Sequence, residues 1–496
     1  MDFLSTLDVT NEQMILMNVL LGEKPVDILD PVVHMHKQVN EHDIVELDCR
    51  MKQEVYEAVT ASLLPGVSIQ IEYGLAESKK VIFYGVVTAV DVTSALEEYL
   101  PAYLIHLTGM SYSCMLDQQK KCRAYQNPEA SYSQIIQYIL SSYSGTNFII
   151  APEMAGGCLD TFTVQYNETD WEFLKRLASG NGGSLQASSI SKGIKFKYGI
   201  ILSNQIYGVS EHDLKSVKEI QTVSGYQPES FLGQCREEYC VQLTTNGPDA
   251  QSLEIGDCIK VWEQLWYVRE VRAEIRDHVL THTYRLAGRS GFWEEKRYNF
   301  QLQGTSVKGT VQEVLKNRLK VCLDMESYPA ENECWFPYST FYSLFYCMPE
   351  KGDRVNLYFP DHQECHAIVL NSMHAPFEEQ ADSGKCNFPL AELIEDNQVK
   401  IWITKDKKML ILDDRNRKGS LVCKDGSHIT VCEDQIYLNT TQEIHLQTEG
   451  NICLAAGKAI DLSTEGTVEI KCKDSSITIS DASIDIHADD IKMNEG

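Results

Sequence analysis

The chain has 496 residues, of which 43% are hydrophobic and 23% charged, and its formal net charge is −27. The length predicts three or four domains, and the composition is typical of soluble globular proteins. The negative charge argues against nucleic acid or an anionic membrane surface as a partner. Because the first residues contain no basic segment and no long apolar run, we expect no secretory signal, no membrane-spanning helix, and synthesis in the cytoplasm.

Sixteen cysteines are spread singly along the chain. The closest two, Cys235 and Cys240, lack the two-residue gap of a zinc knuckle or a redox motif. We interpret the cysteines as reduced residues that serve as small hydrophobic side chains.

Residues 1–110 are predicted to be rich in β-strands. Apolar and polar residues alternate from Val67 to Tyr73, and after a polar turn at residues 77–80 a second apolar run covers residues 81–87. This pattern indicates two consecutive strands. Gly85 lies within the second run, where a glycine favours a bend in the wall of a barrel.

Two amphipathic helices are predicted next. Ser131 with Gln134, and Thr169 with Glu172, have the three-residue spacing of a capping box. Each pair precedes apolar residues at helical spacing, and the segment 180–183 ends the second helix with three glycines. Because both helices are short, we expect them to cover sheets rather than to form a bundle.

Strand patterns return in residues 200–300, where tight turns separate alternating segments. A compact unit follows from residue 304 to about residue 372 and contains about five short strands. Its turn at residues 351–353 leads into the alternating apolar residues Val355, Leu357 and Phe359. The length and strand number predict a small β-barrel such as an OB-fold.

Residues 375–398 have the composition of a linker, and a basic segment interrupted by apolar residues follows them. We interpret the basic segment as a solvated collar, and contact with an acidic partner is the alternative. The basic residues are Lys405, Lys407, Lys408, Arg415, Arg417 and Lys418.

From residue 421 onward, pairs of apolar residues at positions i and i+2 recur about every eight residues. Such a pair places both side chains on one face of a strand, and the intervening polar residues supply the other face and the bends. The repeat therefore predicts a stack of short strands with one apolar face. The pairs are Leu421/Cys423, Ile429/Val431, Ile436/Leu438, Ile444/Leu446, Ile452/Leu454, Ile460/Leu462, Val468/Ile470, Ile477/Ile479, Ile484/Ile486 and Ile491/Met493.

One repeat is too short to enclose a core, since a strand of about five residues spans only about 17 Å. Either three successive repeats form one coil of a single-chain solenoid, or three chains each contribute one repeat per turn. We favour the intertwined trimer, because a single chain would complete only about three coils, near the minimum for a solenoid. The predicted trimer core consists of Ile436, Leu438, Ile444, Leu446, Ile452, Leu454, Ile460, Leu462, Val468, Ile470, Ile477, Ile479, Ile484, Ile486, Ile491 and Met493.

The sequence contains no dinucleotide-binding, Walker, metalloprotease or nucleophile-elbow motif. His362 and His366 are four residues apart, but they lie in a region predicted to be β, where this spacing forms no metal-binding face. Glu168 and Asp170 could be taken for a glycosidase pair, and we interpret them instead as capping residues of the second helix. We expect no catalytic residue and no cofactor.

His445 and His487 directly follow Ile444 and Ile486. Strand alternation directs these histidines outward when the aliphatic residues point inward. An axial metal site at His487 would need the opposite orientation, so we expect no metal site and a dry, aliphatic core.

The segment VQYNETDWEFLKRL at residues 164–177 strongly resembles the strand and acidic, aromatic helix of VgrG proteins of type VI secretion systems and of tail-hub proteins of contractile phages. Residues 122–127 (CRAYQN) resemble that family's lead-in to its first helix. Residues 349–355 (PEKGDRV) resemble the turn of its OB-fold, and the terminal repeat resembles its β-helical spike.

The resemblance implies a mainly β fold with a few helices. Residues 1–300 would form two β-barrels with an inserted helical α+β part, and residues 301–375 an OB-fold neck. Residues 376–420 would be a linker and collar, and residues 421–496 an intertwined trimeric β-helix. Since the sequence ends soon after the last apolar pair, we expect neither a C-terminal toxin domain nor a lysozyme insertion after the OB-fold.

The resemblance also implies a homotrimeric hub and membrane-puncturing spike of a contractile injection particle, with a mechanical and effector-carrying role and no enzymatic activity. The implied partners are the inner tube protein, baseplate components, a PAAR-like tip protein, effectors and the target-cell envelope, and no nucleic acid. The particle would be assembled in the cytoplasm and delivered outside the cell or into a target cell.

Two alternatives stay open. A prophage tail hub would share the mechanism and differ only in the particle, so sheath, tube and capsid genes beside this one would distinguish the two. A β-helical polysaccharide lyase or hydrolase would need a cluster of carboxylates along one face of a single-chain solenoid, and the sequence shows no such cluster.

Overall fold

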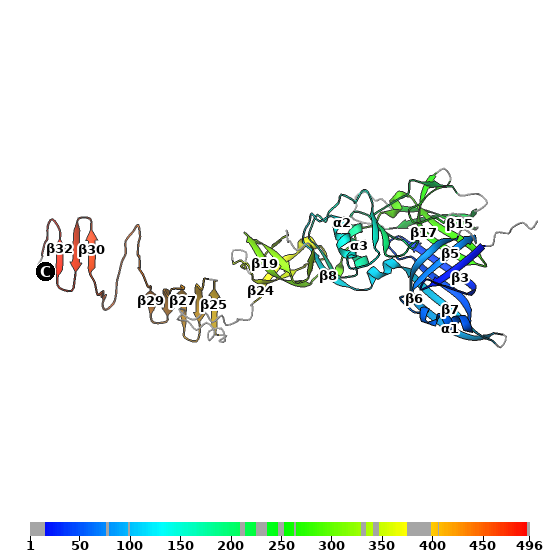
Figure 1. Ribbon diagram of the computed structural model, residues 1–496. Helices are drawn as coiled ribbons and strands as arrows, with labels where there is room; N and C mark the ends of the chain where they lie inside the picture. Colours follow the sequence, from blue (N-terminus) through cyan, green and yellow to red (C-terminus); the bar gives the residue numbers. More distant parts are fainter. Residues whose placement is uncertain are drawn as a thin grey trace, which may run out of the picture. The chain divides into compact units, whose positions relative to one another are not determined.

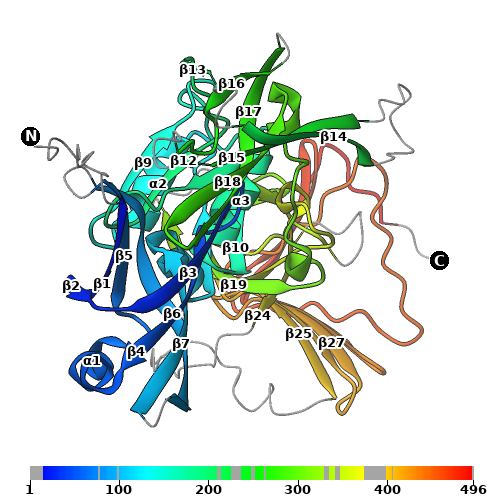
Figure 2. The same cartoon turned by 90° about the vertical axis from the view of Figure 1, so that its right-hand side faces the viewer.

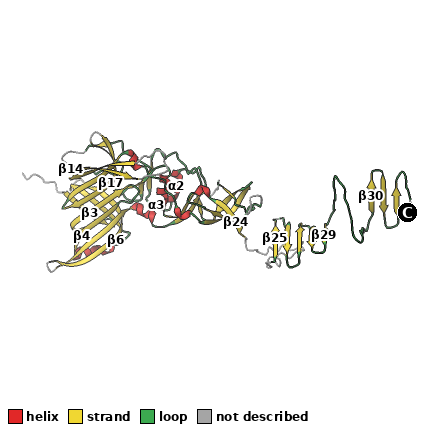
Figure 3. Cartoon of the chain, turned by 180° about the vertical axis from the view of Figure 1, so that it is seen from behind, coloured by secondary structure: helices red, strands yellow, loops and turns green. Residues whose placement is uncertain are grey.

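The computed structural model describes residues 15–75, 79–97, 100–208, 214–224, 236–246, 252–261, 264–328, 334–340, 347–373, 398–404 and 406–493. The chain divides into two units, residues 1–378 and residues 379–496. Strands dominate the described part of both units (Figure 3), which confirms the expected mainly β fold with a few helices. None of the described helices is long and apolar enough to span a membrane.

Unit 1 is built around a 13-stranded sheet (Figures 1 and 2). Its main path runs β14-β15-β18-β17-β3-β4-β7-β6-β5-β1-β2, and β16 joins β13 to β17. No described strand pair connects the two ends of this path, so the two barrels expected in residues 1–300 stay a prediction. The strands are β1 (Ile15–Leu21), β2 (Lys24–Val26), β3 (Leu29–Gln38), β4 (Ile44–Lys52), β5 (Ser68–Leu75), β6 (Lys80–Glu97), β7 (Leu100–Ser111), β13 (Ile206–Tyr207), β14 (Leu214–Ser224), β15 (Arg236–Asn246), β16 (Cys258–Val261), β17 (Gln264–Arg276) and β18 (Val279–Ala287).

Alternation along these strands places one set of side chains in a buried core. Val33, Val45, Ile69 and Phe83 are fully buried there, because successive residues of a strand point to opposite faces. The helices α1 (Gln53–Val59) and η1 (Thr60–Ser62) connect β4 to β5 beside this core. The two consecutive strands predicted from residues 67–87 are present as β5 and β6, and they pair antiparallel.

Gly85 of β6 allows two backbones to approach closely. A Cβ atom at this position would lie 2.2 Å from the carbonyl oxygen of Met110 on β7. Every residue other than glycine carries that atom, so the side chain is excluded by the neighbouring strand rather than by local conformation.

An α+β part lies between β7 and β13. Its helices and strands pack on a core that includes Tyr125, Ile135, Trp171 and Phe196. Both predicted helices are present, as α2 and α3. The elements are η2 (Tyr112–Asp117), β8 (Lys121–Tyr125), α2 (Tyr132–Leu140), β9 (Asn147–Ile150), β10 (Thr163–Glu168), α3 (Asp170–Ser179), β11 (Leu185–Ala187) and β12 (Lys195–Tyr198).

A five-stranded sheet follows, in the order β22-β20-β19-β23-β24. An isolated bridge joins Tyr338, directly after β22, to Val369 of β24, so the two edges of the sheet meet. The segments η3 (Arg289–Phe292) and η4 (Phe300–Leu302) precede the sheet. The remaining elements are β19 (Ser306–Leu315), β20 (Arg318–Leu323), β21 (Glu326–Tyr328), β22 (Trp335–Pro337), β23 (Arg354–Tyr358), η5 (Glu364–His366) and β24 (Ile368–Met373).

Unit 2 contains two antiparallel sheets of sequential strands, separated by residues 440–467, which form no described strand. The expected linker lies almost wholly in residues 374–397, outside the described residues. Among the described residues of this unit, the first strand begins at Val399. The described basic residues, which are all of the set except Lys405, lie in or next to the turns on either side of β26. The strands are β25 (Val399–Ile403), β26 (Met409–Asp413), β27 (Lys418–Val422), β28 (His428–Cys432), β29 (Ile436–Asn439), β30 (Val468–Cys472), β31 (Ser475–Ile479) and β32 (Ile484–His487).

Candidate functional site

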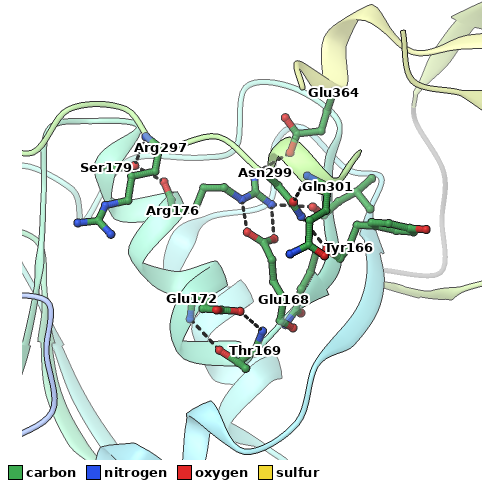
Figure 4. A network of polar contacts seen from close by, with 12 residues as sticks. Tyr166, Glu168, Thr169, Glu172, Arg176, Ser179, Arg297, Asn299, Gln301 and Glu364 are labelled. Atoms are coloured by element: carbon green, nitrogen blue, oxygen red, sulfur yellow. Dashed lines mark hydrogen bonds and ion pairs between the residues drawn. The ribbon is translucent and has the colours of Figure 1, made fainter. Parts of the chain in front are cut away.

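The helix α3 begins with the capping box that the sequence predicted. Thr169 Oγ1 accepts a hydrogen bond from the backbone N–H of Glu172 at 3.1 Å, and Glu172 Oε2 accepts one from the N–H of Thr169 at 2.9 Å (Figure 4). These two bonds satisfy donors that a helix start otherwise leaves free. Trp171, the second residue of α3, is buried, and its indole N–H donates to the carbonyl of Asn40.

Asp170, the first residue of α3, is a fully buried carboxylate with four donors. Its Oδ1 accepts from Arg123 at 2.8 Å and from Gln165 at 3.0 Å. Its Oδ2 accepts from Lys121 at 2.7 Å and from the hydroxyl of Tyr143 at 2.8 Å. Four good donors offset the cost of removing this charge from water.

Arg176 lies in the last turn of α3 and is nine-tenths buried. Its guanidinium donates to both carboxylate oxygens of Glu168 at 2.7 and 2.8 Å, and to the carbonyl of Val164 at 2.6 Å. It also donates to Glu364 of η5 at 2.7 Å (Figure 4). Burial alone would lower the pKa of Arg176, but the charges of Glu168 and Glu364 raise it above its ordinary value. Arg176 therefore joins the α+β part to the five-stranded sheet.

The contacts of Glu168 and Asp170 correct the sequence interpretation of both residues. Neither carboxylate caps α3, because the cap is the side chain of Thr169. Each is instead the counter-ion of buried cations, Arg176 for Glu168 and Lys121 with Arg123 for Asp170. The three-residue spacing of a capping box can be recognised in a sequence. The cations that pair with Glu168 and Asp170 lie on other elements.

The segment between η3 and β19 crosses the end of α3. The backbone N–H of Arg297 donates to Ser179 Oγ at 2.9 Å, and Asn299 Nδ2 donates to the carbonyl of Tyr166 at 2.7 Å (Figure 4). Asn167 Nδ2 donates to Gln301 Oε1 beside them. These bonds attach the chain that enters the five-stranded sheet to α3 and β10.

An apolar core continues through the same place. Ala124 of β8 and Val164 of β10 are fully buried in one cluster with Val321 and Leu357 of the five-stranded sheet. The strand β21 also pairs in parallel with β8. We call the contacts of Arg176, the segment 297–301 and this core the neck joint; its apolar residues are buried and its polar groups are hydrogen-bonded, as a rigid connection requires.

A serine, a histidine and an aspartate meet near the start of α3. His42 Nδ1 lies 2.8 Å from Ser113 Oγ, and His42 Nε2 lies 3.4 Å from Asp117 Oδ2. This arrangement resembles a nucleophile with its base, but Ser113 is fully buried and also bonds Ser111. A nucleophile must reach a substrate, so we assign this cluster to structure.

The histidines considered as ligands have other contacts, and the predicted β structure at two of them is wrong, because His362 lies in a bend and His366 in η5. His362 packs against the rings of Tyr298 and Phe300, and His366 Nδ1 lies 2.7 Å from Asp361 Oδ2. Within the described ranges, no three His, Cys, Asp or Glu residues are grouped to hold a metal ion. His487 pairs with Ser476 whereas Ile486 pairs with Ile477, so the register confirms that His487 and the aliphatic residues lie on opposite faces. His445 lies outside any described strand, so its orientation stays a prediction.

The apolar face of unit 2 is the second candidate site. Cross-strand pairs put the repeated aliphatic residues on one face, among them Leu421↔Ile429 and Ile470↔Ile477. These side chains are exposed in the single chain, for example Ile436 at 70% and Leu462 at 70%. Of the predicted core residues, Ile436, Leu438, Val468, Ile470, Ile477, Ile479, Ile484 and Ile486 lie in strands, whereas Ile444, Leu446, Ile452, Leu454, Ile460, Leu462, Ile491 and Met493 do not.

The structure extends this face toward the N-terminus. Leu410 pairs with both Trp402 and Leu421, and Leu412 lies two residues further along the same strand. Trp402 is 63% exposed, so this end of the face is also uncovered in the single chain. Sequence reasoning missed these residues, although Leu410 and Leu412 form the same i, i+2 pair as the repeat.

Residues 43–194 match the model of the phage tail baseplate hub (GPD) family. No curated protein sequence matches the chain. An Escherichia coli component of the type VI secretion system, described as structurally similar to the T4 bacteriophage tail proteins gp27 and gp5, is similar with a TM-score of 0.53 and 14% identity. That match covers 72% of this chain and 99% of the other.

A half-lidded PdpA-VgrG complex from Francisella is similar with a TM-score of 0.54 and 8% identity, covering 86% of this chain and 88% of the other. At such identities the likeness concerns the fold. The chain therefore has the fold of VgrG and tail-hub proteins, and the resemblance identified from its sequence is confirmed.

Proposed function

We propose that three copies of this chain form the hub and puncturing spike of a contractile injection particle. The coarser part of this function, a baseplate hub or tail spike of a phage or type VI secretion-like system, is supported by the family match and by the fold. The observation that carries the finer part is the exposed aliphatic face of unit 2 on a chain with that fold.

The aliphatic face favours association between copies. Large exposed apolar patches are uncommon on soluble monomers, and burying one Ile or Leu side chain completely contributes about 1.5–3 kcal/mol. Residues 440–467 add a second argument, because they carry three of the apolar pairs and yet form no described strand within their own chain. Strands of two further copies would supply both the missing hydrogen bonds and the cover.

The neck joint suits a mechanical role. A puncturing device transmits force along its length, so the connection between hub and neck must resist separation. Arg176 with two carboxylates, the bonds of segment 297–301 and a continuous apolar core provide that resistance within unit 1.

The proposed trimer contacts the inner tube protein and baseplate components through its hub, carries effectors, and ends in a PAAR-like tip protein. It acts on the envelope of the target cell, without enzymatic activity and without binding nucleic acid. It is assembled in the cytoplasm and leaves the producing cell with the particle. The related complex whose description names PdpA supports a hub with bound partner proteins.

A prophage tail hub is the second candidate, favoured by the phage tail family whose model matches residues 43–194. The two candidates share the trimer and the spike. Particles purified from the producing cell would contain a capsid in the prophage case and none in the secretion case.

The test compares two triple variants in cells that produce the particle from an otherwise deleted gene. Ile444→Lys, Ile460→Lys and Ile477→Lys together place charge on the apolar face, where burial of an unpaired charge is strongly unfavourable. His445→Lys, Asp461→Lys and Thr478→Lys, at the next positions, form the matched control.

We expect the first variant to abolish assembled particles and effector delivery, and the control to retain both. Normal particles and delivery in cells with the first variant would contradict the proposal.

A further inference from the structure

The turn between β3 and β4 attaches the α+β part to the large sheet. Asn40 exchanges two hydrogen bonds of 2.8 Å with the backbone of Leu185 on β11. The carbonyl of Asn40 also accepts from the indole of Trp171 on α3 at 3.2 Å. We call residues 40–43 with these partners the turn contact.

Asp43 is the unusual member of the turn contact. Its side chain is fully buried, and neither carboxylate oxygen has a hydrogen-bond partner among the described residues. The hydroxyl of Ser189, from the segment after β11, is buried beside it, and its attraction for the charged carboxylate opposes the effect of burial without cancelling it. A buried carboxylate without partners is costly while it is charged, and it becomes a donor once protonated.

The charged groups around Asp43 do not neutralise it completely. Lys37 of β3 is the nearby cation, but its Nζ is bound to Glu254 at 2.7 Å. The negative charge of Glu254, from the segment before β16, disfavours a second negative charge on Asp43. His42 lies next to Asp43 in the turn. His282 of β18 faces Lys37, and burial lowers the pKa of His282 to about 4, so this histidine stays neutral above that pH.

His42 links the turn contact to the start of α3. Ser113 bonds His42 on one side and Ser111 on the other, and Ser111 Oγ accepts from the backbone N–H of Asp43 at 3.1 Å. On its other nitrogen, His42 faces Asp117, which also bonds the capping residue Thr169.

We propose that the turn contact is an acid-strengthened connection, in which the buried Asp43 carboxyl takes up a proton while the α+β part is packed against the sheet and releases it when the contact opens. The hub would therefore hold together more firmly in an acidic compartment than at alkaline pH.

The direction of the pH effect follows from linkage. Burial raises the pKa of Asp43 to about 6 from 3.8, although the charge of Lys37 opposes this rise. A group that binds its proton more tightly in the closed state favours closure at low pH, and the cost of its charge is fully present above the raised pKa. The opening equilibrium of the turn contact should therefore increase about tenfold between pH 5 and pH 8.

The test measures hydrogen exchange of peptides containing Asn40 and Leu185 in the full-length protein at several pH values, corrected for the intrinsic exchange rate. The Asp43→Asn variant cannot ionise, and Glu41→Gln removes an exposed neighbouring carboxylate as the matched control. We expect opening to rise about tenfold from pH 5 to pH 8 in the unmodified protein and in Glu41→Gln, and to stay flat in Asp43→Asn.

Two results would overturn the proposal. One is equal protection of these peptides across the pH range in the unmodified protein, a measurement that does not depend on any variant folding. The other is a pH dependence that persists in Asp43→Asn.

Discussion

Replacing Arg176 by Met tests the neck joint most sharply. Methionine keeps much of the length of the side chain but removes the charge and all the donors. The Glu168 and Glu364 side chains, only 10% and 15% exposed, would then lose their counter-ion together. Removing one partner of a buried ion pair costs about 3–5 kcal/mol, because an uncompensated charge stays in the interior.

Lys175→Met is the matched control at the neighbouring position. The Lys175 ammonium lies 4.0 Å from Glu41, whose side chain is 59% exposed. Because Glu41 is exposed and the two charges are far apart for an ion pair, this pair contributes at most about 1 kcal/mol. Both variants remove one positive charge, and the environments of the two lost charges differ.

Hydrogen exchange of the peptides spanning α3 and η5 is the suitable assay, because a chain with several domains need not unfold in one step. We expect the free energy of opening to fall by about 3–5 kcal/mol in Arg176→Met and by no more than about 1 kcal/mol in Lys175→Met. Equal losses in the two variants would refute the assignment of Arg176 to the neck joint.

Two further substitutions test the interior of unit 1. Gly85→Ala should destabilise the 13-stranded sheet by about 1–3 kcal/mol, since the added Cβ would lie 2.2 Å from a backbone oxygen. Gly156→Ala is the control, because the space around Gly156 is open and the stability should change little. Thermal unfolding followed by circular dichroism compares these two. Asp170→Asn should lower the free energy of opening of the α+β part by about 3–5 kcal/mol, measured by hydrogen exchange of the peptides spanning β8 and α3, because Lys121 and Arg123 lose their anion. Unchanged exchange of these peptides would contradict the role given to this carboxylate.

Local signals explain what the sequence could predict. A capping box and an i, i+2 repeat are encoded within a few residues, so the starts of both helices and the alternation of the repeat strands agree with the structure. The period of the apolar pairs also identified the face that is exposed in unit 2.

The neck joint could not be predicted in the same way. Arg176 and Glu364 are 188 residues apart, and nothing in either local sequence names the other as a partner. A related limit explains the misassigned carboxylates. The spacing of Glu168 and Asp170 near a helix start suggested capping, whereas cations on other elements, Arg176 for Glu168 and Arg123 for Asp170, determine their roles.

The apolar face shows a different limit. Leu410 and Leu412 repeat the i, i+2 pattern, but the basic residues around them favoured a solvated collar. The structure places the described basic residues in or next to the turns, and the strand register shows that the leucines continue the face. One segment can therefore carry basic residues at its turns and alternating apolar residues at the centres of its strands.

The mass of the purified full-length protein in solution, measured by light scattering, tests the central claim most directly. The hub-and-spike account predicts a stable particle with three times the chain mass of 56.2 kDa. A stable monomer of 56.2 kDa under assembly conditions would contradict it.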